Sequence, residues 1–193
     1  RCRDSCSRSG CNGRALVRPG YLDRLIAAVS LLEQRGHTLQ VFLLGGGRHE
    51  SVLRRQVRTR NLSSSVTFAP PLSDLTAAMQ SADIFVRPSS DSDFTADGLL
   101  AMGAGLVVVT DPSLLCDHVR PGETAMVCAQ PTAESLATTI EGMLNHRQEA
   151  IGLASAAMDY VREHHAVSMM AERTAAAYRQ LALASTTFAI REP

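Results

Sequence analysis

Three loops in this sequence carry residues that could bind an anionic ligand. They read GGGRHE (45–50), PSSDSDFTADG (88–98) and DPSLLCDHVRPGE (111–123). Consecutive glycines let main-chain amides approach a phosphate closely, although a strand that ends in a tight turn uses glycine equally often. Arg14 and Arg18 add guanidinium groups that could pair with a diphosphate or stand as ordinary surface charge. The chemistry indicated is phosphate binding, provided that the fold brings these loops together.

The elements that would position the loops follow from the spacing of the apolar residues. Leucine, isoleucine and valine recur at helical spacing from Leu22 to Leu32, and this pattern stops at Gly36, a residue typical of helix C-termini. The continuous apolar run at 38–44 is typical of a strand buried on both faces, and LVVVT (106–110) is β-branched enough to predict the centre of a sheet. Further strands are predicted at 66–68, 83–86 and 125–128, and further helices at 48–60, 72–81, 98–103, 113–119, 132–145, 147–164 and 168–184.

Alternation of strands and helices predicts a doubly wound α/β domain with a Rossmann-like, mostly parallel sheet. The three loops then lie at the carboxyl ends of strands, where such folds bind ligands. We expect the domain to span residues 14–184, between a disordered or non-native tail at 1–13 and a frayed tail at 185–193.

Composition removes several classes of function. The chain has 193 residues, which suits one domain, and its 19 basic residues, all of them arginine, balance 19 acidic ones. Neutrality argues against a nucleic-acid partner, and the absence of lysine excludes Schiff-base chemistry and a P-loop lysine. Five cysteines without paired zinc spacing argue against a metal site, and no apolar run is long enough for a transmembrane segment. We therefore expect a cytoplasmic protein, with peripheral membrane contact left open.

Short motifs in a fixed order make the chain resemble a known family. They run GR (13–14), PGYLDRLIAA (19–28), FLLGGG (42–47), SADIFVRPS (81–89) and FTADGLLAMGAGLVVVT (94–110), followed by DHVRPGETA (117–125). The chain is similar over residues 13–184 to the C-terminal, nucleotide-sugar-binding domain of retaining GT-B glycosyltransferases. This resemblance implies the C-terminal half of a GT-B fold. An unrelated flavodoxin-like or dehydrogenase domain is disfavoured, because no G-x-G-x-x-G opens a βαβ unit.

The resemblance also implies roles for particular residues. In the family, the arginine of the GR motif and a nearby lysine bind the diphosphate of the donor. Arg14 matches that arginine, whereas Pro19 stands at the lysine position with Arg18 beside it. Gly45, Gly46 and Gly47 match the glycines at the floor of the donor cleft. No metal ion or other cofactor is implied, because arginine and helix N-termini neutralise the leaving diphosphate.

The largest departure from the family concerns two glutamates. The signature P-S-x-x-E-x-F-G-x4-E-A-M-A-x-G aligns so that its glutamates fall on Ser92 and Leu100, and Thr95 replaces the glycine after Phe94. The first glutamate normally touches the transferred sugar, and the second accepts hydrogen bonds from the ribose. Asp93 could compensate for the first loss or could cap the helix that follows. We assign the remaining donor contacts to Ser92, Asp93, Phe94 and Thr95, and no catalytic residue.

Two functions from different classes follow. The first is the donor-binding part of a glycosyltransferase, which moves a sugar from a nucleotide diphosphate sugar to a glycan or lipid-linked acceptor and needs an N-terminal acceptor domain as partner. The second is a catalytically silent GT-B-like module that binds a nucleotide or a protein. The polar stretch SCSRSGCN before Gly13 cannot supply the family's first strand. We therefore expect a sheet that lacks this strand and a fragment that is inactive by itself. Separately, we expect His49 and His118 to be surface or helix-capping residues.

Overall fold

The structure is a computed structural model that describes residues 13–17, 22–44, 49–70, 75–87, 96–112 and 117–189. For residues 13–17 and 183–189 it describes the backbone only. Six of the elements are strands: β1 (Gly13–Val17), β2 (Leu39–Leu44), β3 (Val66–Ala69), β4 (Ile84–Arg87), β5 (Val107–Thr110) and β6 (Met126–Val127). The helices are α1 (Leu22–Gln34), α2 (Glu50–Thr59), α3 (Leu75–Gln80), α4 (Asp97–Gly103), α5 (Ala133–Asn145), α6 (Arg147–His164) and α7 (Val167–Ala189).

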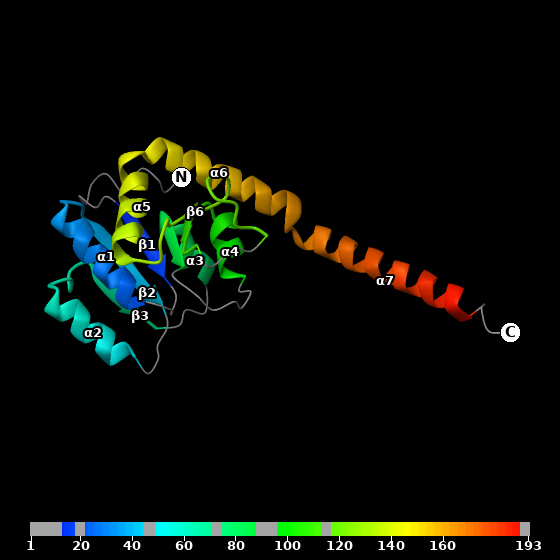
Figure 1. Cartoon of the computed structure of the whole chain (residues 1–193), viewed down its shortest axis with the longest axis horizontal. Helices are drawn as coiled ribbons and strands as arrows, with labels where there is room; N and C mark the ends of the chain where they lie inside the picture. Colours follow the sequence, from blue (N-terminus) through cyan, green and yellow to red (C-terminus); the bar gives the residue numbers. More distant parts are fainter. Residues whose placement is uncertain are drawn as a thin grey trace.

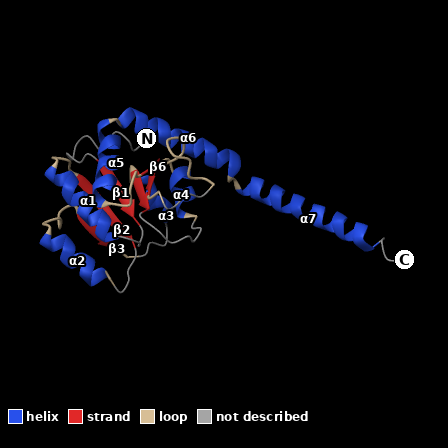
Figure 2. Cartoon of the chain, viewed as in Figure 1, coloured by secondary structure: helices blue, strands red, loops and turns tan. Residues whose placement is uncertain are grey.

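The described strands form one parallel sheet in the order β3-β2-β1-β4-β5-β6. Helices lie on both faces of this sheet (Figures 1 and 2). The strand order changes direction between β1 and β4, and the next described helices, α1 and α4, cover opposite faces of the sheet. This is the doubly wound α/β fold that the sequence predicts.

The two faces of the sheet carry separate hydrophobic clusters. One lies under α1, α2 and α5 and includes Leu25, Leu32, Val109 and Ile140. The other lies under α3, α4 and part of α6 and includes Phe85, Met102 and Val108. Successive residues of β4 and β5 alternate between the clusters, because neighbouring side chains on a strand point to opposite faces. Both strands are consequently buried along their whole length.

The first strand corrects the sequence prediction. The sheet does not lose its first strand, because GRALV (13–17) forms β1 and pairs with β2 on one side and β4 on the other. The prediction looked for an apolar run before Gly13, whereas the strand uses the apolar residues after Arg14. Neighbours on both sides give the backbone of this short strand hydrogen-bond partners that the sequence does not reveal.

Two smaller predictions differ from the structure where it can be compared. LVVVT does not lie at the centre of the sheet: β5 is next to the edge strand β6, and β1 and β4 are central. Its β-branched composition reflects burial on both faces, which β5 obtains without a central position. The helix predicted at 113–119 is not seen in its described part, where residues 117–118 form a turn.

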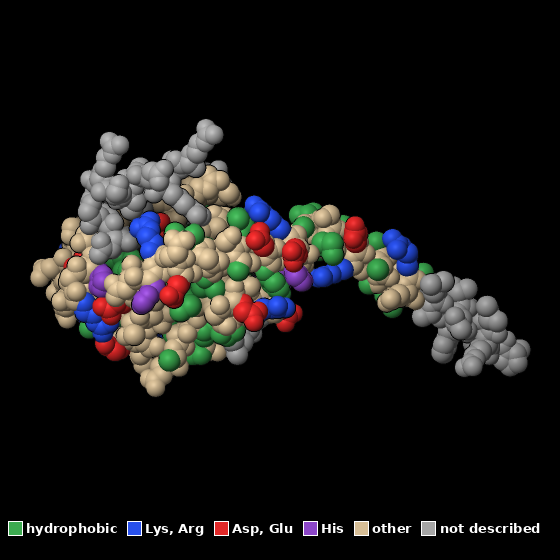
Figure 3. Space-filling view, turned by 90° about the horizontal axis from the view of Figure 1, so that it is seen from above, with side chains coloured by type: hydrophobic (Ala, Val, Ile, Leu, Met, Phe, Trp, Pro, Cys, Tyr) green, Lys and Arg blue, Asp and Glu red, His purple; other side chains and the backbone are tan. Residues whose placement is uncertain are grey.

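The C-terminal helix α7 extends away from the sheet and its covering helices (Figure 1). It continues to Ala189, past the boundary at residue 184 that the sequence suggests. Figure 3 shows apolar side chains and charges of both signs along it, and Val167, Met170, Tyr178 and Leu181 are exposed. None of the helices in the described part of the chain is both long and apolar enough to cross a membrane.

Candidate functional site

The carboxyl ends of β4, β5 and β6 lie side by side, and we name this end of the sheet the ligand edge. Arg87 is the last residue of β4 and is level with Thr110, the last residue of β5, which is in turn level with Val127. Asp111 follows directly. Because all three strands are parallel, the polar residues at the ends of β4 and β5 lie at the same end of the sheet. The expected meeting of the three loops stays a prediction, because residues 45–48, 88–95 and 113–116 lie outside the described residues.

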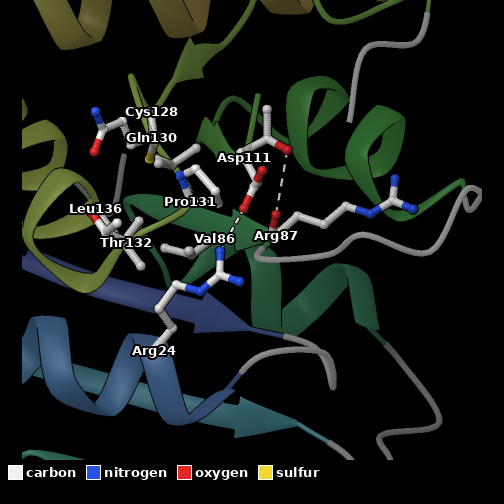
Figure 4. A pocket seen from close by; sticks show the side chains of 11 residues that line it. Arg24, Val86, Arg87, Asp111, Cys128, Gln130, Pro131, Thr132 and Leu136 are labelled. Atoms are coloured by element: carbon white, nitrogen blue, oxygen red, sulfur yellow. Dashed lines mark hydrogen bonds and ion pairs between the residues drawn. The ribbon is translucent and has the colours of Figure 1, made fainter. Parts of the chain in front are cut away.

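An ion pair fixes α1 to this edge. The Nη1 atom of Arg24, in the first turn of α1, lies 2.6 Å from Oδ2 of Asp111, and the two side chains are 21% and 8% exposed. Figure 4 shows the Arg24 side chain reaching from α1 to the end of β5. A carboxylate this deeply buried requires a charged or hydrogen-bonded partner. Sequence analysis missed this pair, because residues 87 positions apart carry no local signal of contact.

A small pocket lies beside the ion pair. Arg24, Asp111, Cys128, Thr132 and Leu136 are among the residues that line it (Figure 4). Its volume is about 10 Å³, which accommodates roughly one water molecule. Burial raises the pKa of the Cys128 thiol, which keeps this group neutral and unreactive. The pocket is therefore too small for a nucleotide, and a larger ligand would have to bind over it, along the edge.

Arg87 is buried, and its side chain lies on the face of the sheet opposite to Arg24. It is 8% exposed, and its carbonyl oxygen accepts a hydrogen bond from the Thr110 hydroxyl at 3.4 Å. Figure 4 shows its guanidinium directed away from Arg24. Its charge instead acts on His118, whose pKa lies below the ordinary value mainly because of burial, with smaller effects from His165 and Arg87.

His118 differs from the sequence prediction. It is not a surface or cap residue, because only 2% of it is exposed. The end of helix α6, more than forty residues further along the chain, lies close to the His118 ring. No sequence pattern around DHVRPG predicts that contact. His49, by contrast, is exposed and immediately precedes α2, as predicted.

The sequence-predicted donor residues fall into three groups. Arg18, Gly45, Gly46, Gly47, Ser92, Asp93, Phe94 and Thr95 lie outside the described residues. The backbone of Arg14 lies within β1, level with Gln40 and three residues before the end of the strand, so its Cα is roughly 10 Å from the ligand edge. Leu100 lies on α4 and is 48% exposed.

No set of three or more His, Cys, Asp or Glu side chains in the described ranges is arranged to hold a metal ion. Among the described residues, the charged groups at this end of the sheet are Arg24 and Asp111, which form an ion pair, and Arg87, whose guanidinium is directed away from them. These groups do not by themselves favour an anionic ligand over a cation.

Comparison with known proteins gives one family and a consistent fold. The model of the family "Glycosyl transferases group 1" matches residues 8–146. Among curated proteins, no relative matches.

Three solved structures show the fold. Sucrose-phosphate synthase from Thermosynechococcus elongatus is 23% identical, with a TM-score of 0.73 over 89% of this chain and 46% of its own. HepE from Anabaena, in complex with UDP and glucose, is 17% identical, with a TM-score of 0.76 over 88% and 48%. The C-terminal domain of a group 1 glycosyl transferase, LpcC from Francisella tularensis, is 15% identical, with a TM-score of 0.71 over 80% and 86%. The chain thus spans about half of the first two proteins and most of the isolated C-terminal domain.

Proposed function

Because the chain belongs to the glycosyl transferases group 1 family, we propose that it is the donor-binding domain of a retaining glycosyltransferase. The enzyme transfers a sugar from a nucleotide diphosphate sugar to a glycan or lipid-linked acceptor, which an N-terminal domain holds. The strand order carries this proposal: it reverses between β1 and β4, and ligands of doubly wound sheets bind in the crevice beyond that point. HepE from Anabaena, which shares the fold, is a complex with UDP and glucose.

The donor diphosphate binds across the loops that follow β1, β2 and β4. Arg18 and the amides of Gly45 to Gly47 contact its oxygens, and no metal ion takes part, because guanidinium and amide groups stabilise the leaving diphosphate. Arg24 does not contact the donor directly; its pairing with Asp111 fixes the start of α1 beside the crevice. Arg14 has the weakest claim to a phosphate contact, since its backbone lies away from this edge.

Donor binding is weaker than in relatives that keep both glutamates. Leu100 stands where the family places the carboxylate that accepts ribose hydrogen bonds, and its 48% exposure leaves the position open to a ligand. A hydrogen bond to a charged group contributes about 1.5–3 kcal/mol, so its absence weakens nucleotide binding by about tenfold to a hundredfold. Such a domain is impaired, and alone it does not turn over substrate.

Restoring the carboxylate tests the proposal. We expect Leu100→Glu to tighten binding of UDP-glucose or GDP-mannose by about tenfold or more in titration calorimetry. Ile151→Glu is the matched control, because Ile151 is 38% exposed on α6 and lies within four residues of Arg147, which pairs with Asp83 at the opposite edge of the sheet. If neither the wild type nor Leu100→Glu binds either sugar nucleotide at millimolar concentration, the donor-binding proposal is wrong.

The second candidate is a catalytically silent module that keeps the fold and binds a nucleotide or a protein. The replacement of both family glutamates, by Ser92 and Leu100, favours it. Leu100→Glu separates the two: recovered affinity indicates a donor site that lost one contact, whereas unchanged affinity indicates a site no longer shaped for the donor. With a nucleotide sugar as its ligand, we place the protein in the cytoplasm.

A further inference from the structure

A cluster of ring side chains joins the end of α6 to the segment after β5, and donor binding as proposed above does not use it. We name this cluster the histidine junction. It consists of Asp117, His118, Arg120, Tyr160, His164 and His165.

Stacked rings hold α6 in the junction. The Tyr160 ring stacks on His164 with centroids 4.4 Å apart, and the Arg120 guanidinium lies 4.6 Å from the Tyr160 centroid. The Tyr160 hydroxyl donates a hydrogen bond to the Asp117 carbonyl oxygen at 3.2 Å. These contacts fix the last turns of α6 against the segment 117–120.

His118 lies between two helices at the buried end of the junction. Its ring meets His165 edge to face, with centroids 6.1 Å apart. On its other side, Nε2 lies only 3.4 Å from the position that a Cβ would take on Gly98, in the first turn of α4. The His118 carbonyl oxygen also accepts a hydrogen bond from the buried Thr124 hydroxyl at 2.7 Å, which fixes the backbone. His118 thus contacts both the first turn of α4 and the end of α6, two helices that also pack on each other directly through Met102, Ala157 and Val161.

The surroundings of His118 disfavour a second proton on its ring. The neighbouring charged and titratable groups are Arg87 on β4, Asp97 on α4, Asp117 and Arg120 on its own segment, Tyr160, His164 and His165 on or beside α6, and Arg173 on α7. Burial is the main cause that lowers the pKa of both His118 and His165. Asp117 has the opposite effect on the pKa of His118, but it is the smallest of the causes. In the neighbouring ring, the buried Nε2 of His165 has no hydrogen-bond partner in the described part of the chain, so a proton there would lack an acceptor.

We propose that His118 is a positioning residue of the ligand edge: its neutral ring holds the first turn of α4 against the end of α6, and protonation of the ring releases both helices. The role in ligand binding rests on the proposed function, since α4 carries Leu100 and follows the loop at 88–95. The release itself is a property of the fold. It also loosens the joint at residues 165–166, where α6 ends and α7 begins.

Hydrogen exchange at pH 7.5 and pH 5.5, corrected for intrinsic rates, tests the release. In the wild type, we expect protection of residues 97–103 and 160–166 to fall by about tenfold or more at the lower pH, while α1 keeps its protection. His118→Gln retains a polar side chain that cannot titrate in this range, so its protection should change with pH clearly less than that of the wild type, the remaining change coming from His165. His146→Gln is the control, because the His146 side chain is 66% exposed, and it should behave as the wild type.

Two results would overturn the proposal: wild-type protection that does not change between the two pH values, or a His118→Gln variant that keeps the full change. If His118→Gln does not fold, His165→Gln provides the test. It leaves His118 in place and removes a neighbour that lowers the pKa of His118, so the release should move to higher pH. An unchanged midpoint would then contradict the proposal.

Nucleotide titration separates this inference from the proposed function. In the Leu100→Glu background, affinity for the sugar nucleotide should fall between pH 7.5 and pH 5.5, and adding His118→Gln should remove that fall. If no sugar nucleotide binds at either pH, the proposed function is wrong, and the exchange experiment still decides the role of His118. If binding is strong and equal at both pH values, His118 does not position the ligand edge.

Discussion

Two junctions between helices use similar side chains in opposite ways. At the α1–α5 junction, Arg35 forms ion pairs with Glu134 and Glu141, and His37 lies 3.0 Å from Glu141. Solvent reaches these groups, and their charges attract one another. In the histidine junction, His118 and His165 are neutral rings next to arginines, and burial excludes added charge. A side chain's neighbours and its access to water, more than its type, therefore decide how it responds to acid.

The two junctions should lose their contributions to the free energy of unfolding in different pH ranges. Histidines whose pKa is lowered in the folded state bind fewer protons there than in the unfolded chain, so stability is present above the ordinary value of 6.5 and is lost as pH falls below it. Hydrogen bonds from His37 and Arg35 lower the pKa of Glu141, so its contribution is lost only as pH falls below the ordinary value of 4.5. Mild acid should therefore loosen the histidine junction first.

The largest expected effects come from the cores beneath the two junctions. Leu32 lies on α1 and Met102 on α4, and both are fully buried. We expect Leu32→Ala and Met102→Ala each to lower the free energy of unfolding by about 2–5 kcal/mol in urea denaturation at pH 7.5, because each leaves a cavity. Only Met102→Ala should also make residues 160–166 exchange faster at neutral pH.

Leu181→Ala is the control for this pair, because Leu181 is 65% exposed on α7 and should change stability by less than about 0.5 kcal/mol. Equal exchange at 160–166 in both core variants would mean that the two faces of the sheet are not mechanically distinct.

An intermediate effect is expected at the Arg24–Asp111 pair, whose burial lies between those of the two junctions. Arg24→Ala removes a charged partner from a carboxylate that is only 8% exposed, so we expect the free energy of unfolding to fall by about 1.5–3 kcal/mol. Arg162→Ala is the matched control, because Arg162 forms an exposed pair with Asp159 on α6 and its loss should cost about 0.5 kcal/mol or less. Equal losses in the two variants would contradict the special role of the buried pair.

The smallest effect is expected for Glu141→Gln at the exposed junction. Its thermal midpoint at pH 7 should be slightly below that of the wild type, because water screens these charges. The difference should vanish in about 1 M salt, where the Debye length is roughly 3 Å, and should shrink as pH falls below the ordinary value of 4.5 and the wild-type carboxylate takes up its proton. A difference that neither salt nor acid reduces would mean that packing, and not charge, makes the contact.

Much of the fold follows from the sequence, because its signals are local. Gly36 ends α1 with a φ of 88°, a conformation that glycine adopts without strain. The run at 38–44 becomes β2, and the period of apolar residues identifies α1, α5 and α6. The sequence prediction of β1 failed, because a five-residue strand with a polar start is stabilised mainly by the strands on both sides of it.

For the candidate site, the sequence by itself identified the family, which the family model confirms. It also predicted ligand loops at the carboxyl ends of strands and the replacement of two acidic positions by Ser92 and Leu100, and these stay predictions. Those features reside in residue types and their order along the chain. Only the tertiary structure decided that Arg24 pairs with Asp111 and that His118 is buried between α4 and α6. Both contacts join residues far apart in sequence, and the burial that sets their charge is supplied by elements that no local pattern can indicate.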